Sequence, residues 1–393
     1  HQLVSKKTKA PALSFDMVMI VAILALVIIV GGISLYAYLR PTPPPQIAYL
    51  YPIRDGIPNL WVYTLDDESD TQPEQVTFTT MGVYDYDISD DGRFLMYSTP
   101  NQTLSRDIYQ LNLRTGNVEA LTTCASEGAD CYAPAIHPTD PILAYTRVAD
   151  NVGGLDERER RPRIWLRDLE TNTERPLSPN PDDTGHSAVW SRDGNTLAYT
   201  TDTLEQTGTM VFQFADRDGG ASRLNFIPSG YGSTGTLSPD GTALIIPDLT
   251  SRNGQIFSYL KWVDFTITPP TFENFTSPDE PVDDVAIEWH PDQHNLTVAR
   301  RYTDERWTRG YQLYTLDTET NEATPLFTDN AYSHHFFAWH PDGEQLVMQR
   351  LPLNETGNIS SASQPSIWVF TPSTQAMSLI ADDAYLPHWV VRE

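Results

Sequence analysis

Lysine is almost absent from this sequence. Only four of the 393 residues are lysines, and three of them, Lys6, Lys7 and Lys9, lie in the first nine positions. From residue 46 onward, one lysine and 21 arginines stand against 51 acidic residues, a formal net charge of −29. So acidic a body has no basic excess to displace counterions from phosphates, which excludes a general nucleic-acid-binding protein.

Cysteine is also scarce, with Cys124 and Cys131 as the two copies. Their spacing fits neither a zinc site nor a redox C-x-x-C motif, and the haem-attachment motif C-x-x-C-H is absent. Outside the cytoplasm we expect the two to form a disulfide within one loop, with two free thiols as the alternative. A nucleophile elbow is missing too, because Tyr231 stands where Gly232-Ser233-Thr234-Gly235 would need a glycine.

The sequence has one long apolar run, the 23 uncharged residues from Met17 to Leu39. As a helix this run would be roughly 35 Å long, enough to cross a hydrocarbon core of ~30 Å. A cleaved signal peptide is the alternative, but its apolar region is normally shorter and Leu35-Tyr36-Ala37-Tyr38 is a poor cleavage site.

The lysines before this run predict a cytoplasmic N-terminus. We therefore expect a cytoplasmic tail (1–16), an uncleaved signal anchor in the lipid bilayer (17–39) and a stiff proline-rich linker (40–45). The remainder (46–393) is expected outside the cytoplasm, held at the cell membrane by this single pass.

The remainder of the chain repeats one unit. An apolar residue or Trp is followed by Ser or His, then by a turn rich in Pro, Asp and Gly, then by a β-type run. Pro presets φ, Asp binds its own backbone and Gly accepts positive φ, so each copy predicts a hairpin between two strands. Six copies recur about every 50 residues and start at Ile88, Ile136, Trp190, Leu237, Trp289 and Trp339.

A third strand can be recognised seven times, at 60–63, 108–111, 164–166, 210–212, 256–259, 312–314 and 367–369. The first of these follows a second strand at 47–50 that has no first strand before it. The missing strand lies at the other end of the chain, where Trp389 stands 50 residues after Trp339. This pattern predicts an all-β, seven-bladed β-propeller in which the last strand closes the first blade. Six or eight blades are the alternatives.

The copy Trp339-His340-Pro341-Asp342-Gly343 and the strand after it resemble the repeat of TolB-type and WD-repeat-like bacterial propellers. The resemblance covers roughly residues 46–391. TolB-type proteins are periplasmic, bind a lipoprotein partner and have six blades with an additional N-terminal domain. This chain differs by its predicted anchor and its seven blades. The resemblance therefore implies an extracytoplasmic platform that binds other proteins.

Two patterns are compatible with metal binding. His137, His290 and His340 are ligand types, but all three occupy the repeat position where other copies carry Ser, which favours capping of the turn. The segment Asp87-x-Ser89-x-Asp91-Gly92 loosely resembles a calcium loop but lacks the distal Glu and coincides with a repeat turn. We therefore expect no metal, no cofactor and no catalytic set.

The entry to each first strand is the more informative position. Four residues before the apolar or Trp position the sequence has mostly Tyr and His, among them Tyr84, Tyr132, His186, His335 and Tyr385. First strands line the channel of a propeller, so these side chains are expected around its mouth. Tyr and His combine apolar area with hydrogen bonding, which suits recognition. The alternative is packing between inner strands.

Loops on the same face carry arginines, which are local positive features in an acidic body. One group is Arg158, Arg160 and Arg161, and the other is Arg300 and Arg306 with Trp307. Solvated, self-paired charge is the alternative. Together these features predict a non-catalytic, extracytoplasmic protein-binding scaffold, an accessory subunit of a larger membrane assembly. A sensor or a carbohydrate- or small-ligand-binding propeller is the alternative, followed by a propeller hydrolase or lyase.

Overall fold

The computed structural model describes residues 44–54, 56–65, 72–149, 160–202, 207–214, 222–360 and 363–391, and the single positions Met19, Ile23 and Leu26. The chain divides into two compact units, His1–Pro43 and Pro44–Glu393. The predicted tail and most of the predicted anchor lie outside the described residues, as does Arg158. Within the described part, no helix has the length and apolar character needed to cross a membrane.

The described part of the second unit contains seven four-stranded antiparallel sheets, the blades of a propeller. Blade 1 consists of β28 (Tyr385–Val390), β1 (Gln46–Tyr51), β2 (Asn59–Thr64) and β3 (Glu74–Gln75). Blade 2 consists of β4 (Asp85–Ile88), β5 (Phe94–Pro100), β6 (Arg106–Asn112) and β7 (Val118–Ala120). Blade 3 follows the 3-10 helix η1 (Cys124–Glu127) and consists of β8 (Ala129–Ile136), β9 (Ile142–Ala149), β10 (Arg163–Asp168) and β11 (Glu174–Pro176).

Blade 4 consists of β12 (His186–Trp190), β13 (Thr196–Asp202), β14 (Thr207–Gln213) and β15 (Arg223–Pro228). Blade 5 consists of β16 (Thr236–Leu237), β17 (Ala243–Arg252), β18 (Gln255–Asp264) and β19 (Thr271–Asn274). Blade 6 consists of β20 (Val282–Trp289), β21 (Asn295–Tyr302), β22 (Gln312–Asp317) and β23 (Ala323–Phe327). Blade 7 consists of β24 (Tyr332–Trp339), β25 (Leu346–Pro352), β26 (Ser366–Thr371) and β27 (Ala376–Asp382).

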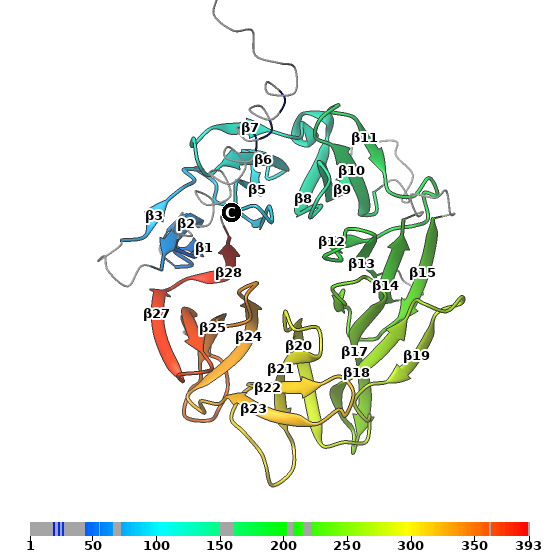
Figure 1. The fold of residues 1–393 in the computed structure, drawn as a ribbon, viewed down its shortest axis with the longest axis vertical. Helices are drawn as coiled ribbons and strands as arrows, with labels where there is room; N and C mark the ends of the chain where they lie inside the picture. The colour runs from blue at the N-terminus through cyan, green and yellow to red at the C-terminus, as the bar shows by residue number, and fades with distance from the viewer. Residues whose placement is uncertain are drawn as a thin grey trace, which may run out of the picture. The chain divides into compact units, whose positions relative to one another are not determined.

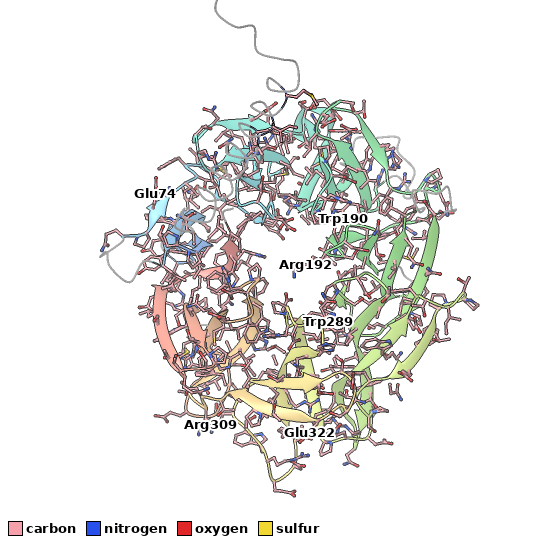
Figure 2. All side chains as sticks on the ribbon, in the orientation of Figure 1. Glu74, Trp190, Arg192, Trp289, Arg309 and Glu322 are labelled. Atoms are coloured by element: carbon pink, nitrogen blue, oxygen red, sulfur yellow. A yellow bond between two sulfur atoms is a disulfide. The ribbon has the colours of Figure 1, made fainter. Side chains whose placement is uncertain are left out.

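The seven blades stand in a ring (Figure 1). The ring closes in blade 1, where C-terminal β28 pairs with N-terminal β1, with Ile47 opposite Trp389. The predicted seven-bladed fold and its closure by the last strand are therefore confirmed. Figure 2 shows Trp190 and Trp289 on the inner side of their blades and Glu74 at the outer side.

The repeated turn joins the first and second strands of a blade. Where it carries serine, the hydroxyl holds both ends of the turn: Ser89 Oγ donates to Asp91 Oδ1 at 2.7 Å and accepts from the amide of Phe94 at 3.0 Å. Glycine supplies the left-handed residue, as at Gly343 with φ of 75°. Blade 6 instead has Gln293 there, with φ of 65°.

Where the turn carries histidine, the imidazole caps it and packs against the next blade. His137 Nδ1 accepts from the amide of Asp140 at 2.9 Å, and its ring lies 4.6 Å from the ring of Trp190. The same ring contact joins His290 to Trp339 at 4.4 Å and His340 to Trp389 at 4.8 Å. The capping interpretation of these histidines therefore holds. Among the described residues, no three His, Cys, Asp or Glu side chains gather in a way that could hold a metal ion.

Candidate binding site at the channel mouth

The first strands begin at the propeller face opposite the repeated turns, and several of them are irregular at that point. Pairing shifts register after Tyr132 in β8 and after His186 in β12. The residues that follow Tyr132, His186 and Tyr385 all have positive φ: 50° at Ala133, 55° at Ser187 and 52° at Leu386. A β-bulge bends a strand and re-aims its side chains. At these bulges the side chains of Tyr132, His186 and Tyr385 therefore point in directions that a regular strand would not give them.

Each of these three left-handed residues is bound by the preceding blade. The amide of Ala133 donates to Asp85 Oδ2 at 2.8 Å, that of Ser187 to Thr146 Oγ1 at 3.1 Å, and that of Leu386 to Gln349 Oε1 at 3.0 Å. A buried amide without a partner would be costly, so these acceptors stabilise the bulges. They also leave these three amides unavailable to a ligand.

A pocket of about 830 Å³ opens where the first strands of blades 1 to 4 begin. Four of the five predicted mouth residues line it, namely Tyr84, Tyr132, His186 and Tyr385. The rest of the wall is mostly apolar and includes Pro58, Met81, Val83, Pro100 and Leu386. The structure therefore brings these four predicted residues together.

An arginine that the sequence pattern did not indicate fixes two of the tyrosines. The guanidinium carbon of Arg106 lies 4.2 Å from the ring centre of Tyr84 and 3.9 Å from that of Tyr132. Arg106 also donates from Nε to Asp130 Oδ1 at 2.9 Å and pairs through Nη2 with the other carboxylate oxygen. Both rings are thus held by one cation whose charge is already neutralised by Asp130.

The phenol oxygens of Tyr84, Tyr132 and Tyr385 have no hydrogen-bond partner within the part of the chain that the structure describes. Burial raises the pKa of Tyr132 and of Tyr385, and the nearby phenol of Tyr84 raises both further. The hydroxyls of Tyr132 and Tyr385 are therefore protonated at neutral pH and available to donate to a ligand.

Asp85 is the acidic side chain of the wall, and its oxygens are occupied. Oδ1 accepts from the hydroxyl of Ser98 at 2.5 Å, and Oδ2 accepts from the amide of Ala133. Burial raises the pKa of this carboxyl, while its two hydrogen bonds act in the opposite direction. Asp85 thus joins blades 2 and 3 and does not present an unsatisfied charge to the pocket.

His335 lies outside this pocket, in a separate polar cluster of blades 5 to 7. Its ring is 5.0 Å from that of Tyr311, whose hydroxyl donates to Asp283 Oδ2 at 2.6 Å. Asp283 also accepts from Arg301 Nη2 at 2.8 Å and from the amide of Ser258 at 2.9 Å. Burial would raise the pKa of Asp283, but the hydrogen bonds from Tyr311 and Ser258 outweigh it and lower the pKa.

Arg300 corrects one sequence prediction. It was expected in a surface loop, but β21 continues to Tyr302 and sets Arg300 opposite Asp284, with which it forms two hydrogen bonds of 2.7 and 2.9 Å. The side chain is 2% exposed, so no partner can reach it.

The other predicted loop residues that the structure describes differ in ion pairing and in exposure. Arg306 pairs with Asp304, with Nη2 to Oδ2 at 2.6 Å, and lies 4.0 Å from the ring of Tyr302, so its charge is self-paired. Trp307 beside it is 58% exposed. Arg160 and Arg161 are half-buried before β10.

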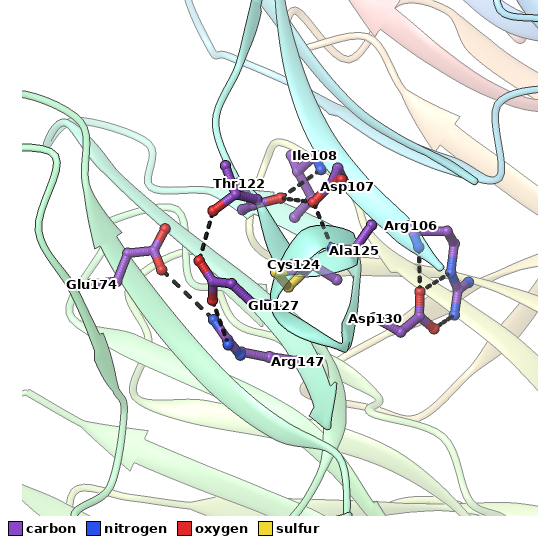
Figure 3. Close-up of a disulfide and its surroundings, with 12 residues drawn as sticks. Arg106, Asp107, Ile108, Thr122, Cys124, Ala125, Glu127, Asp130, Arg147 and Glu174 are labelled. Atoms are coloured by element: carbon purple, nitrogen blue, oxygen red, sulfur yellow. Dashed lines mark hydrogen bonds and ion pairs between the residues drawn. A yellow bond between two sulfur atoms is a disulfide. The ribbon is translucent and has the colours of Figure 1, made fainter. Parts of the chain in front are cut away.

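Cys124 and Cys131 are disulfide-bonded, with their Cα atoms 5.9 Å apart (Figure 3). Cys124 begins η1, whereas Cys131 lies in β8 and not in the loop where the sequence placed it. Figure 3 shows the Arg106–Asp130 pair next to this short covalent loop. Asp130 directly precedes Cys131, so the disulfide and β8 together restrain the carboxylate that holds Arg106.

No protein-family model matches the sequence. A search of curated proteins also gives no match. Solved structures do resemble it. TolB from Acinetobacter baumannii is 15% identical, with 88% of this chain and 66% of that chain covered and a TM-score of 0.49.

Two protease structures are also similar. The β-propeller domain of the Trilobed protease from Pyrococcus furiosus is 15% identical, covers 78% of this chain and 85% of its own, and has a TM-score of 0.54. A puromycin-hydrolyzing peptidase of Mycobacterium tuberculosis is 11% identical, covers 87% and 53%, and has a TM-score of 0.56.

This chain spans about half the length of that peptidase and just under two thirds of TolB. The Pyrococcus propeller is described as having an open velcro topology, whereas here β28 closes blade 1 on β1. Likeness at these identities shows the fold alone, and that fold is the β-propeller, built here from seven blades.

Proposed function

We propose that this chain is a non-catalytic scaffold that binds another protein through the mouth pocket, as an accessory subunit of a membrane assembly. In this proposal residues 17–39 anchor it in the cell membrane and the propeller lies outside the cytoplasm. The observation that carries the binding role is the pocket itself. Two of its tyrosines, Tyr84 and Tyr132, are held in place by Arg106 before any ligand arrives, which lowers the entropy cost of binding.

The surroundings of the pocket support a protein partner. Apolar side chains remain exposed in the nearby loops of blades 1 and 2: Ile57 is 48% exposed, Met81 44%, Tyr84 60% and Leu104 71%. Met81 and Tyr84 line the pocket itself, and exposed apolar residues beside an aromatic pocket are typical of a recognition surface. A soluble small-molecule pocket would not need such a rim.

Co-purification of the full chain from membranes in mild detergent tests this role. We expect a partner to co-purify and to be lost when Tyr84 and Tyr132 are both changed to alanine. The matched control changes two residues of blade 5, Ile267→Ala and Phe272→Ala, which are 51% and 56% exposed away from the mouth. A clean monomer, or equal loss of the partner in both variants, contradicts the proposal.

The proposed topology has its own test. Trypsin added to intact cells should cut the propeller at exposed arginines and leave a membrane-retained N-terminal fragment. Protection of the propeller until the membrane is permeabilised would place it in the cytoplasm and refute the orientation.

The pocket volume favours one further candidate, a sensor or binder of a small ligand or carbohydrate. Small-molecule pockets generally measure some 300–1,000 Å³, and this one falls in that range. A thermal-shift panel of sugars and metabolites distinguishes the candidates. A ligand-induced stabilisation that disappears with Tyr132→Ala but persists with His335→Ala supports the small-ligand candidate, because His335 lies outside the pocket.

A further inference from the structure

The mouth pocket combines apolar walls with hydroxyl groups from three blades that have no partner among the residues the structure describes. Tyr385 comes from blade 1, Tyr84 from the entry to blade 2 and Tyr132 from blade 3. The ring centres of Tyr84 and Tyr132 lie 6.5 Å apart, and Tyr385 lines the same pocket. A ligand in this pocket therefore meets several hydroxyl donors at once, between faces of aromatic rings and the side chains of Pro58 and Pro100.

The carboxylate of the wall, Asp85, and the guanidinium of Arg106, which contacts the rings of Tyr84 and Tyr132, already have protein partners. Arg106 is paired with Asp130, and Asp85 accepts from Ser98 and from the amide of Ala133. A charged ligand would therefore lose hydration without gaining a free counter-charge. The pocket suits a neutral ligand.

The backbone at the pocket is also occupied. The amides of Ala133, Ser187 and Leu386 donate to side chains of the preceding blade. A peptide that adds a β-strand needs free amides and carbonyls at a strand edge, so these bonds disfavour strand addition here. A carbohydrate needs many bidentate partners for its hydroxyls, and the one carboxylate of the wall, Asp85, has both oxygens occupied.

A proline-rich segment meets the remaining requirements. Proline amides supply carbonyl acceptors but no N–H donors, and the polyproline II helix exposes these carbonyls while its rings pack against aromatic side chains. We propose, as a refinement that depends on the proposed binding role, that the mouth pocket binds a proline-rich, neutral, extended segment of the partner protein. Phenol hydroxyls donate to its carbonyls, and its rings pack against the tyrosine rings.

Fluorescence polarisation with the full chain in detergent tests this refinement. The probe is a fluorescein-labelled proline decapeptide, compared with a Gly-Ser decapeptide of the same length. We expect saturable binding of the proline peptide alone. The double variant Tyr84→Phe, Tyr385→Phe keeps the aromatic faces and should weaken binding at least about fivefold, because two hydrogen bonds are lost. Tyr109→Phe in β6 is the matched control and should change nothing.

Three outcomes overturn the refinement: equal binding of both peptides, binding unaffected by the double Tyr→Phe variant, or competition by cellohexaose in place of proline peptide. Failure of the refinement can be told from failure of the binding role. If the co-purifying partner is lost with Tyr84→Ala and Tyr132→Ala but excess unlabelled proline decapeptide does not release it, the refinement fails and the binding role stands. If the partner stays bound in the alanine variant, the binding role fails as well.

Discussion

Trp389 is the residue whose change tests closure of the ring most directly. It lies in β28, is 9% exposed, and packs in one apolar cluster with Ile47 and Tyr49 of blade 1 and Val347 of blade 7. Its indole Nε1 donates to the carbonyl of Ala338 at 2.9 Å. Trp389→Ala therefore removes an apolar contact and a hydrogen bond between the closing strand and blade 7.

The size of the effect follows from these contacts. Truncation of a buried Trp to Ala generally lowers the free energy of unfolding by about 3–5 kcal/mol. Trp389→Phe keeps most of the apolar contact but leaves the Ala338 carbonyl without its donor, at a cost of about 1–3 kcal/mol. For a domain whose total stability is of the order of 5–15 kcal/mol, the alanine change removes a large fraction.

Equilibrium urea denaturation followed by far-UV circular dichroism measures this effect without relying on tryptophan fluorescence. Trp307→Ala is the control, since its side chain is 58% exposed and the expected change is within about 0.5 kcal/mol. The expected order of destabilisation is Trp389→Ala, then Trp389→Phe, then Trp307→Ala. If Trp389→Ala is no more destabilising than Trp307→Ala, β28 does not close the propeller as described.

Three other changes have predictable outcomes. Gln293→Gly should raise the free energy of unfolding by about 0.5–1 kcal/mol in urea titrations, because position 293 has φ of 65° and glycine adopts it without strain. Burial lowers the pKa of His334 to about 4, so unfolding takes up a proton at any pH between 4 and the ordinary histidine pKa of 6.5. The free energy of unfolding should therefore fall by up to about 3 kcal/mol from pH 6.5 to 4 in the wild type, and by less in His334→Asn. For Glu288 the dependence of stability on pH is reversed, because burial raises its pKa to about 7 and stability therefore declines as pH rises from 4.5 through 7. Glu288→Gln should remove this part of the decline between denaturation curves measured at pH 5 and at pH 8.

The fold could be predicted from the sequence because its information is local and repeated. Each turn of Ser or His, Pro, Asp and Gly fixes one hairpin, and the count of third strands leaves one first strand to be supplied by Trp389. The repeat could not predict the residues at which the strands end. β21 extends to Tyr302 and buries Arg300, while β16 has only two residues, Thr236 and Leu237. Strand ends depend on packing between blades, which the repeat does not encode.

The residues of the candidate site could be predicted only in part from the sequence, for the same reason. Alignment of the repeats found Tyr84 and Tyr132, since both occupy a fixed distance from the turn. It could not find Arg106, whose partner Asp130 lies 24 positions further on and in the next blade. Alignment of the repeats also could not show that His335 lies outside the pocket. The pocket is formed by blades 1 to 4, whereas His335 belongs to blade 7.

Ring closure and the proposed binding site share one element, the strand β28. Tyr385 forms part of the pocket wall, and Trp389, four residues later in β28, packs the same strand against blades 1 and 7. A ligand that contacts Tyr385 binds the closed ring and not a ring from which β28 has separated, so by mass action it stabilises closure by RT ln(1 + [L]/Kd), about 2.7 kcal/mol at a ligand concentration of 100 Kd. The same linkage requires that a change which weakens closure also lowers the apparent affinity of the pocket, because only the closed fraction binds. A ligand bound at Tyr385 therefore stabilises the seam of the propeller as well as occupying the pocket.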